Sequence, residues 1–88
     1  MIRKDITLSC AEGLQARAAS MLVQCANRYA SRITLTLGQK TVNAKSLMGV
    51  LSLCVHAGQT LDMRLTGEDE QAACDALCAL FESGFGAQ

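Results

Sequence analysis

Residues 32–43, "RITLTLGQKTVN", constrain the fold more than any other stretch of this chain. In their first half, isoleucine or leucine alternates with threonine, so one side of an extended segment is apolar and the other is polar. Gly38 and Gln39 then favour a tight turn, after which residues 40–43 can return as the second arm of a hairpin. This pattern predicts an antiparallel sheet with one buried face and one face in contact with water.

Two further segments alternate in the same way and supply the rest of the sheet. Residues 60–66, "TLDMRLT", place leucine and methionine on one side and polar side chains on the other. Residues 2–8 follow the same pattern, except that Lys4 stands at a position where an apolar side chain is expected. A charge at such a position is typical of a strand at the edge of a sheet.

Three helices are predicted between and after these strands. The first covers residues 16–29, with apolar positions at helical spacing: Ala19, Leu22, Val23, Ala26 and Ala30. The second covers residues 46–53, with serine as the N-cap. The third follows Glu68, Asp69 and Glu70, whose charges suit a helix N-terminus, and its apolar stripe is Ala72, Ala73, Ala76, Leu77 and Leu80. The order βαββαβα predicts an α+β open-faced β-sandwich, a four-stranded antiparallel sheet covered on one face by three helices.

The chain is expected to form a single domain over residues 1–88, because half of its residues are hydrophobic and they occur along the whole length. Eight basic and eight acidic residues leave no net charge, which argues against general attraction to nucleic acid or to a membrane surface. No signal peptide or membrane-spanning run is evident, so a cytoplasmic protein is expected. The balanced charge does not exclude a local basic patch, for which the candidates are Arg3, Lys4, Arg17, Lys40 and Lys45.

The cysteines are interpreted as free thiols that fill the core of a protein in a reducing compartment. Their number is odd and no Cys-x-x-Cys motif is present; they are Cys10, Cys25, Cys54, Cys74 and Cys78. Cys74 and Cys78 would share a helix face, and with His56 they could begin a metal site. Zinc ligands usually occur as tightly spaced pairs, so neither a metal nor a cofactor is expected.

Two helix starts carry the candidate functional residues. At the first, Arg17 and the free N–H groups of the opening turn could hold an anion, although most arginines in the first turn of a helix are only solvated. At the second, Ser46 either only caps its helix or is a phosphorylation site. In the second case the phosphate would stand beside an apolar surface of Leu47, Met48 and Leu51 that a partner could cover. These side chains could instead be part of the core.

The stretches "GLQARAAS" at 13–20 and "NAKSLMGVLSL" at 43–53 resemble two motifs of one family. The first is similar to the active-site signature of HPr, the histidine-containing phosphocarrier protein of the sugar phosphotransferase system. The second is similar to the regulatory serine segment of the same family. Their spacing and the predicted order of strands and helices also resemble that family, over nearly the whole chain.

Gln15 stands where the family has its phosphoryl-accepting histidine, and Ala18 stands where it usually has proline. An amide nitrogen is no nucleophile near neutral pH, so the resemblance implies loss of the carrier chemistry. Within the family, glutamine at this position together with an intact serine segment resembles the Crh branch, the catabolite repression HPr proteins. That branch implies phosphorylation of Ser46 by HPr kinase/phosphorylase and action as a corepressor of a LacI-type regulator, catabolite control protein A. The partner-binding positions expected on this basis are Gln15, Arg17, Ser46, Leu47, Met48 and Leu51.

Two other functions are considered beside this non-enzymatic regulatory role. The chain could be a phosphocarrier with another acceptor, for which His56 is the only histidine, although an exposed loop is the simpler assignment for it. It could also be a degenerate HPr domain that binds a metabolic enzyme directly. A homodimer through the strand at residues 2–8 is compatible with the sequence but is not required by it.

Overall fold

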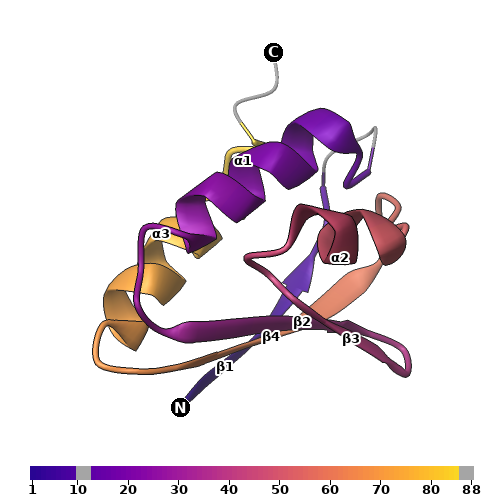
Figure 1. Cartoon of the computed structure of the whole chain (residues 1–88). Coiled ribbons are helices and arrows are strands. Elements are labelled where there is room, and N and C mark those ends of the chain that lie inside the picture. The colour runs from indigo at the N-terminus through magenta and orange to yellow at the C-terminus, as the bar shows by residue number, and fades with distance from the viewer. Residues whose placement is uncertain (10–12, 86–88) are drawn as a thin grey trace.

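A computed structural model describes residues 1–9 and 13–85 of the chain. Its elements are β1 (Ile2–Thr7), α1 (Ala16–Ala26), β2 (Arg32–Leu37), β3 (Lys40–Asn43), α2 (Leu47–Ser52), β4 (Thr60–Thr66) and α3 (Glu70–Glu82). Figure 1 shows all three helices on one side of the sheet. The predicted α+β sandwich and its βαββαβα order are therefore confirmed.

The four strands form one antiparallel sheet in the order β1-β4-β2-β3, so β4 and β2 are central and β1 and β3 are the edges. The alternation of the sequence decides which face is buried. The inward residues of the two central strands are fully buried: Ile33, Leu35, Leu61, Met63 and Leu65. On the outer face Arg3 and Arg64 both form ion pairs with Asp62, at 3.0 and 3.3 Å. The predicted two-sided character of the sheet is confirmed.

Lys4 occupies an inward position of β1, because it stands opposite the buried Met63 in the register. Its neighbours on the same face, Ile2 and Ile6, are half-buried against the core, while Lys4 itself is exposed. An edge strand can accept such a residue because only one of its sides is paired. The predicted edge position of this strand is confirmed.

Helix α1 ends at Ala26, so the prediction that it continues to Tyr29 is wrong. The Asn27 side chain donates to the carbonyl of Val23 and ends the helix. The N–H groups of Arg28 and Tyr29 still donate to carbonyls of the last turn, and those of Ala30 and Ser31 then donate to the Asp69 carboxylate at 2.8 and 2.9 Å. A partner distant in sequence thus redirects the chain.

The buried stripe of α3 is displaced by about one residue from the predicted stripe. Ala73 and Leu77 are buried as expected, but Ala72 is exposed, and the other buried positions of the helix are Cys74 and Phe81. The Phe81 ring packs edge-on against Phe85, with 5.1 Å between ring centroids. Burying these larger side chains gains more than burying Ala72 would. Within the described residues, no helix has the length and apolar character that crossing a membrane requires.

Candidate functional site

The start of α1 is fixed by a close backbone approach at Gly13. Gly13 has a φ of +77°, and a Cβ atom here would lie only 2.6 Å from the carbonyl oxygen of Val55, so no larger residue fits. The next N–H, of Leu14, donates to that same oxygen at 2.9 Å. These contacts bring the beginning of α1 against the loop that follows α2.

Gln15 is the N-cap of α1, with an extended backbone, but its side chain makes no capping hydrogen bond. Its side chain and that of Arg17 are exposed. Arg17 has no side-chain partner within residues 1–9 and 13–85. The site can therefore offer a cation, amide groups and the free N–H groups of a helix start to an anion or to a partner surface. It offers no nucleophile at position 15.

The start of α2 differs, because its N-cap side chain is engaged. Ser46 Oγ accepts a hydrogen bond from the Gly49 N–H at 3.2 Å, as predicted for a capping serine. Ser46 is exposed, and the two residues after it leave the core: Leu47 is 41% and Met48 is 78% exposed. Leu51 is only half-buried and packs partly against the core. The hydroxyl thus stands beside an apolar surface that is open to solvent.

The loop that carries Ser46 is anchored to the end of α1. Lys45 Nζ donates to the carbonyl of Tyr29 at 2.6 Å, and the Lys45 carbonyl accepts from the Asn27 side chain at 3.2 Å. The Lys45 N–H donates to Asn43 Oδ1 at 2.9 Å. These bonds hold the backbone on both sides of residue 45, so the position of the Ser46 cap is fixed relative to α1.

Both lysines beside α2 are bonded to backbone carbonyls. Lys45 binds the chain just beyond α1, and Lys40 Nζ donates to the carbonyl of Ser52, the last residue of α2, at 3.1 Å. Such positions suit cations, because a helix C-terminus carries partial negative charge. Arg3 and Lys4 lie on opposite faces of β1. The five cations considered for a basic patch therefore do not gather on one surface.

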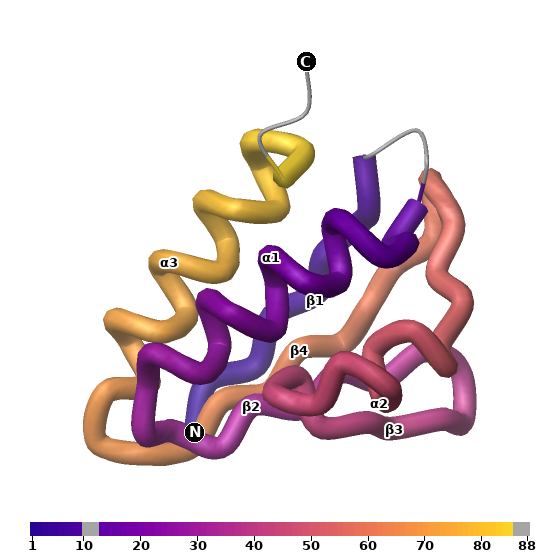
Figure 2. Tube along the Cα trace, turned by 45° about the horizontal axis from the view of Figure 1, so that its top comes forward, coloured from indigo at the N-terminus to yellow at the C-terminus, as the bar shows by residue number. Residues whose placement is uncertain are grey.

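The two helix starts lie at opposite ends of the helix pair α1 and α2. The contacts just described place the start of each helix beside the end of the other, and Figure 2 shows the two helices packed together over the sheet. The 11 residues of α1 span roughly 16 Å at 1.5 Å per residue. The structure thus groups Gln15 with Arg17, and Ser46 with Leu47 and Met48, but separates the two groups.

His56 lies in the exposed loop after α2, as its simpler assignment predicted, and its N–H donates to Gln59 Oε1 at 2.8 Å. His56 is far from the start of α1 in the sequence, but the fold brings the His56 backbone close to the residues just before that helix. The His56 Cα lies 3.4 Å from the point where a Cβ on Gly13 would be. No local sequence signal indicates this proximity, which depends on the bond from Leu14 to Val55.

Four cysteines can be described, and all four are free thiols: Cys25, Cys54, Cys74 and Cys78. Cys10 lies outside the described residues. Cys74 fills the core as predicted, but Cys54 is exposed, so core filling does not explain it. Burial, together with the neighbouring Cys78, raises the pKa of Cys74 to about 11. The structure places no group of three or more potential metal ligands together within its described parts.

Comparison with known proteins identifies the family. The family model for the PTS HPr component phosphorylation site matches residues 2–83. The HPr-like protein Crh of Halalkalibacterium halodurans is 44% identical over 82 residues, which cover 93% of this chain and 98% of that protein. The crystal structure of HPr-C-His from Thermoanaerobacter tengcongensis is 40% identical, covers 100% of this chain and 99% of its own, and superimposes with a TM-score of 0.96.

A crystal structure of Bacillus subtilis Crh is also similar, with 41% identity, 94% of this chain and 95% of its own covered, and a TM-score of 0.75. That Crh is described as a swapped, intertwined dimer. The fold and the sequence thus define one class of small phosphotransferase-system proteins. This chain belongs to the HPr family, and its relatives include proteins of the Crh type.

Proposed function

We propose that this protein is a regulatory, non-enzymatic member of the family, switched by phosphorylation of Ser46 by an HPr kinase/phosphorylase. Its phosphorylated form acts as a corepressor that binds a LacI-type regulator, catabolite control protein A, in carbon catabolite repression. Two considerations support this proposal: similarity to proteins named Crh, and the absence of a nucleophile at Gln15. Without that nucleophile the chain would signal through serine and would take no part in phosphoryl transfer from phosphoenolpyruvate.

The observation that carries the proposal is the surroundings of Ser46. An exposed hydroxyl caps α2, and exposed Leu47 and Met48 stand directly beside it. A phosphate on Ser46 can take up the N–H groups of the helix start, so the fold should accept it without rearrangement. The two lysines beside α2, Lys40 and Lys45, already donate to carbonyl oxygens. The added charge would therefore be presented to a partner that supplies its own cations.

The deciding experiment is titration calorimetry of the phosphorylated and unmodified proteins against LacI-type regulators of the source organism. Two charge-assisted hydrogen bonds to phosphate, each worth roughly 1.5–3 kcal/mol, correspond to a gain in affinity of about two to four orders of magnitude. Ser46→Ala, treated with the same kinase, is the matched control and should show no gain. Equal affinity of both forms would reduce Ser46 to a helix cap and end the corepressor proposal.

Failure of the kinase to modify Ser46 at all would favour a degenerate HPr domain that regulates a metabolic enzyme by direct contact. In that case the candidate contact residues remain the same: Gln15 and Arg17 at the start of α1, and Leu47, Met48 and Leu51 on α2. Incubation with kinase and ATP, followed by mass spectrometry of the intact protein, separates this alternative from the main proposal before any binding partner is needed.

A second candidate function, a phosphocarrier that uses His56, has one specific observation in its favour. The loop that carries His56 packs against Gly13, so the His56 backbone lies beside the segment that leads into Gln15 and Arg17. The test is labelling with phosphoenolpyruvate and Enzyme I. Label that is acid-labile and disappears in His56→Ala would establish this function, while an unlabelled wild-type protein rules it out.

The proposal includes a homodimer through β1. This strand is an edge of the sheet and has one unpaired side, which another chain could extend or replace by exchange. Light scattering over a range of concentrations measures the oligomeric state. A mass that stays at that of one chain throughout would remove the dimer from the proposal and would leave the Ser46 switch unaffected.

A further inference from the structure

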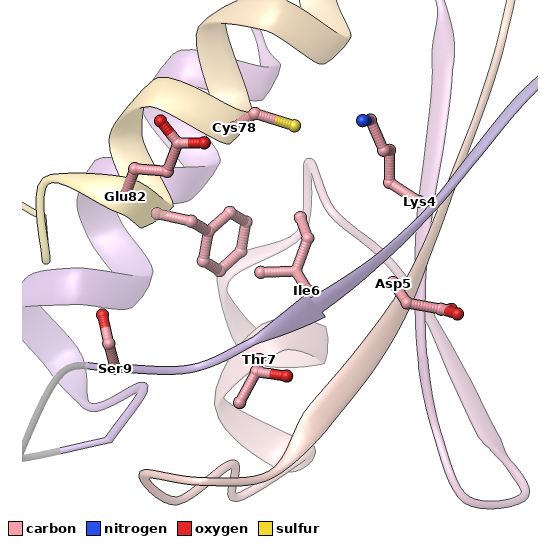
Figure 3. Close-up of a pocket in the computed structure, with 8 residues that line it drawn as sticks. Lys4, Asp5, Ile6, Thr7, Ser9, Cys78 and Glu82 are labelled. Carbon is pink, nitrogen blue, oxygen red and sulfur yellow. The ribbon is translucent and has the colours of Figure 1, made fainter.

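A cavity of about 300 Å³ lies between the edge strand β1 and the second half of α3. Its lining combines an apolar base with charged and nucleophilic groups, as Figure 3 shows: Lys4, Asp5, Ile6, Thr7, Ser9, Cys78, Phe81 and Glu82. None of these residues belongs to the helix starts discussed above. The cavity therefore requires an explanation of its own.

Two thiols stand at this cavity, one behind the other. Cys74 and Cys78 are one turn apart on α3, with 3.9 Å between their sulfur atoms. Cys74 is only 1% exposed and faces the core, whereas Cys78 is half-buried and lines the cavity. Since burial favours the neutral form of the inner thiol, Cys74 can serve as an S–H donor toward Cys78. Cys78 is then the thiol of the pair that reagents can reach.

Lys4 supplies a cation to the same place. It is the residue that interrupts the alternation of β1, and its inward position directs its side chain toward α3. In Figure 3 the Lys4 ammonium and the Cys78 thiol point toward each other across the cavity. Lys4 has no hydrogen-bond or ion-pair partner in the part of the chain that the structure describes. Glu82 lines the same cavity and acts against this attraction.

We propose that Cys78 is a modification site that reacts with small anionic disulfides, such as oxidised glutathione, in the cavity between β1 and α3. The Cys78 thiolate attacks one sulfur of the reagent, a new S–S bond forms, and the other half leaves as a thiolate. The free reagent supplies the oxidising equivalent, and no further reactant is needed. Thiols that are partly exposed and lie near a cation are the ones expected to react in this way.

The reaction stops at the mixed disulfide. Residues four apart on a helix hold their Cβ atoms about 5–6 Å apart, whereas a disulfide requires roughly 3.5–4.5 Å. Cys74 therefore cannot displace the attached group while α3 remains helical. The modification would fill the cavity and press β1 away from α3, at a distance from Ser46, since α2 lies over the other part of the sheet (Figure 1). This inference is independent of the function proposed above.

The test compares two disulfides of opposite charge on the native protein under identical conditions. Oxidised glutathione and cystamine are each reacted with the protein, and peptide mapping gives the modification rates of Cys78 and of the exposed Cys54. Cys54 serves as an internal reference within the same molecules. The ratio of the Cys78 rate to the Cys54 rate should be at least about threefold higher with glutathione disulfide than with cystamine, because Lys4 attracts the anion.

Two variants assign the effect to its source. Lys4→Gln should abolish this reagent preference, while Arg32→Gln, an exposed change on the outer face of β2, should leave it intact. Glu82→Gln should enlarge it. Circular dichroism checks that each variant keeps the native fold. An equal ratio for the two reagents in the wild-type protein, or a preference that survives Lys4→Gln, would overturn the assignment of Cys78 and Lys4 as a reactive pair.

Discussion

The starts of α1 and α2 have the same backbone arrangement but opposite side-chain chemistry. Gln15 and Ser46 are both N-caps with extended backbone, yet only Ser46 places its side chain on a helix N–H. Gln15 leaves its side chain exposed beside Arg17, and Ser46 is followed by two exposed apolar residues. The start of α1 can thus hold an anion but has no nucleophile at position 15, whereas the start of α2 has a hydroxyl, on Ser46, that can be phosphorylated.

This difference indicates that single residues decide what two similar helix starts can do chemically. A helix start offers free N–H groups regardless of its N-cap, so both sites attract negative charge. What can happen there depends on the side chain: an amide only binds, a hydroxyl can be modified, and an imidazole can carry a phosphoryl group. Exchanging these side chains is therefore the direct way to test the comparison.

The largest expected effect is a gain of phosphoryl acceptance at the start of α1. Gln15→His should turn a protein that phosphoenolpyruvate and Enzyme I do not label into one that is labelled, because Arg17 and the helix N–H groups remain in place. Labelling with radioactive phosphoenolpyruvate measures it, and Gln15→Asn is the matched control that should stay unlabelled. Wild-type protein that is labelled as fast as an ordinary HPr would show that the inference from Gln15 is wrong.

The next largest effect concerns the exposed apolar residues that follow Ser46 at the start of α2. Met48→Asp should weaken binding of the Ser46-phosphorylated protein to its regulator by about 10- to 100-fold, since burying a methionine side chain contributes roughly 1.5–3 kcal/mol. Ala72→Asp, a change at an exposed position of α3, is the control and should have little effect. Unchanged affinity of Met48→Asp in calorimetry would exclude this side chain from the contact surface.

A smaller effect is expected on stability, and it has opposite signs at the two starts. Ser46→Ala removes a formed cap and should lower the free energy of unfolding by about 1 kcal/mol. Gln15→Ser supplies a missing cap and should raise it by up to about 1 kcal/mol. Urea denaturation followed by circular dichroism measures both. If the two substitutions changed stability in the same direction, the difference in capping between the helix starts would not be real.

The smallest effect concerns α3, whose start is stabilised by a carboxylate. The Gly67 N–H, and then the N-terminal ammonium 3.1 Å away, lower the pKa of Glu70. A folded-state pKa below the unfolded value of about 4.3 means that this contribution is complete above that pH and is lost as pH falls through the folded pKa. Glu70→Gln should therefore flatten the acid side of a thermal unfolding profile slightly. An unchanged profile would leave Glu70 without a role.

Most of the fold could be predicted because its signals are local. All four strands begin and end within a residue of the predicted positions, since alternation fixes both the face and the extent of a strand. The start of α2 was also predictable, because Ser46 is a preferred cap directly before an apolar run. The family to which both motifs belong could likewise be inferred from short stretches, and the match over residues 2–83 confirms that inference.

The remaining features depend on contacts between distant segments. The path of the chain after α1 is set by Asp69, far along the chain, which binds the N–H groups of Ala30 and Ser31. The orientation of α3 is set by Phe81 and its packing with Phe85, which a stripe of alanines does not indicate. At the candidate site, the neighbourhood of His56 and Gly13 arises only when the loop after α2 meets the start of α1. Periodicity carries no information about such pairings.

The strand order β1-β4-β2-β3 has a consequence for how the chain acquires its structure. The strand made first by the ribosome, β1, pairs only with β4, one of the last segments to be made. Its hydrogen bonds must therefore wait until the other three strands have emerged, and pairings between such distant segments form slowly. Throughout that interval β1 is an open edge beside whatever chains are being synthesised nearby. If the proposed dimer forms by exchange of β1, neighbouring chains that emerge together could complete each other's sheets, and the rate of synthesis would then influence how much dimer accumulates.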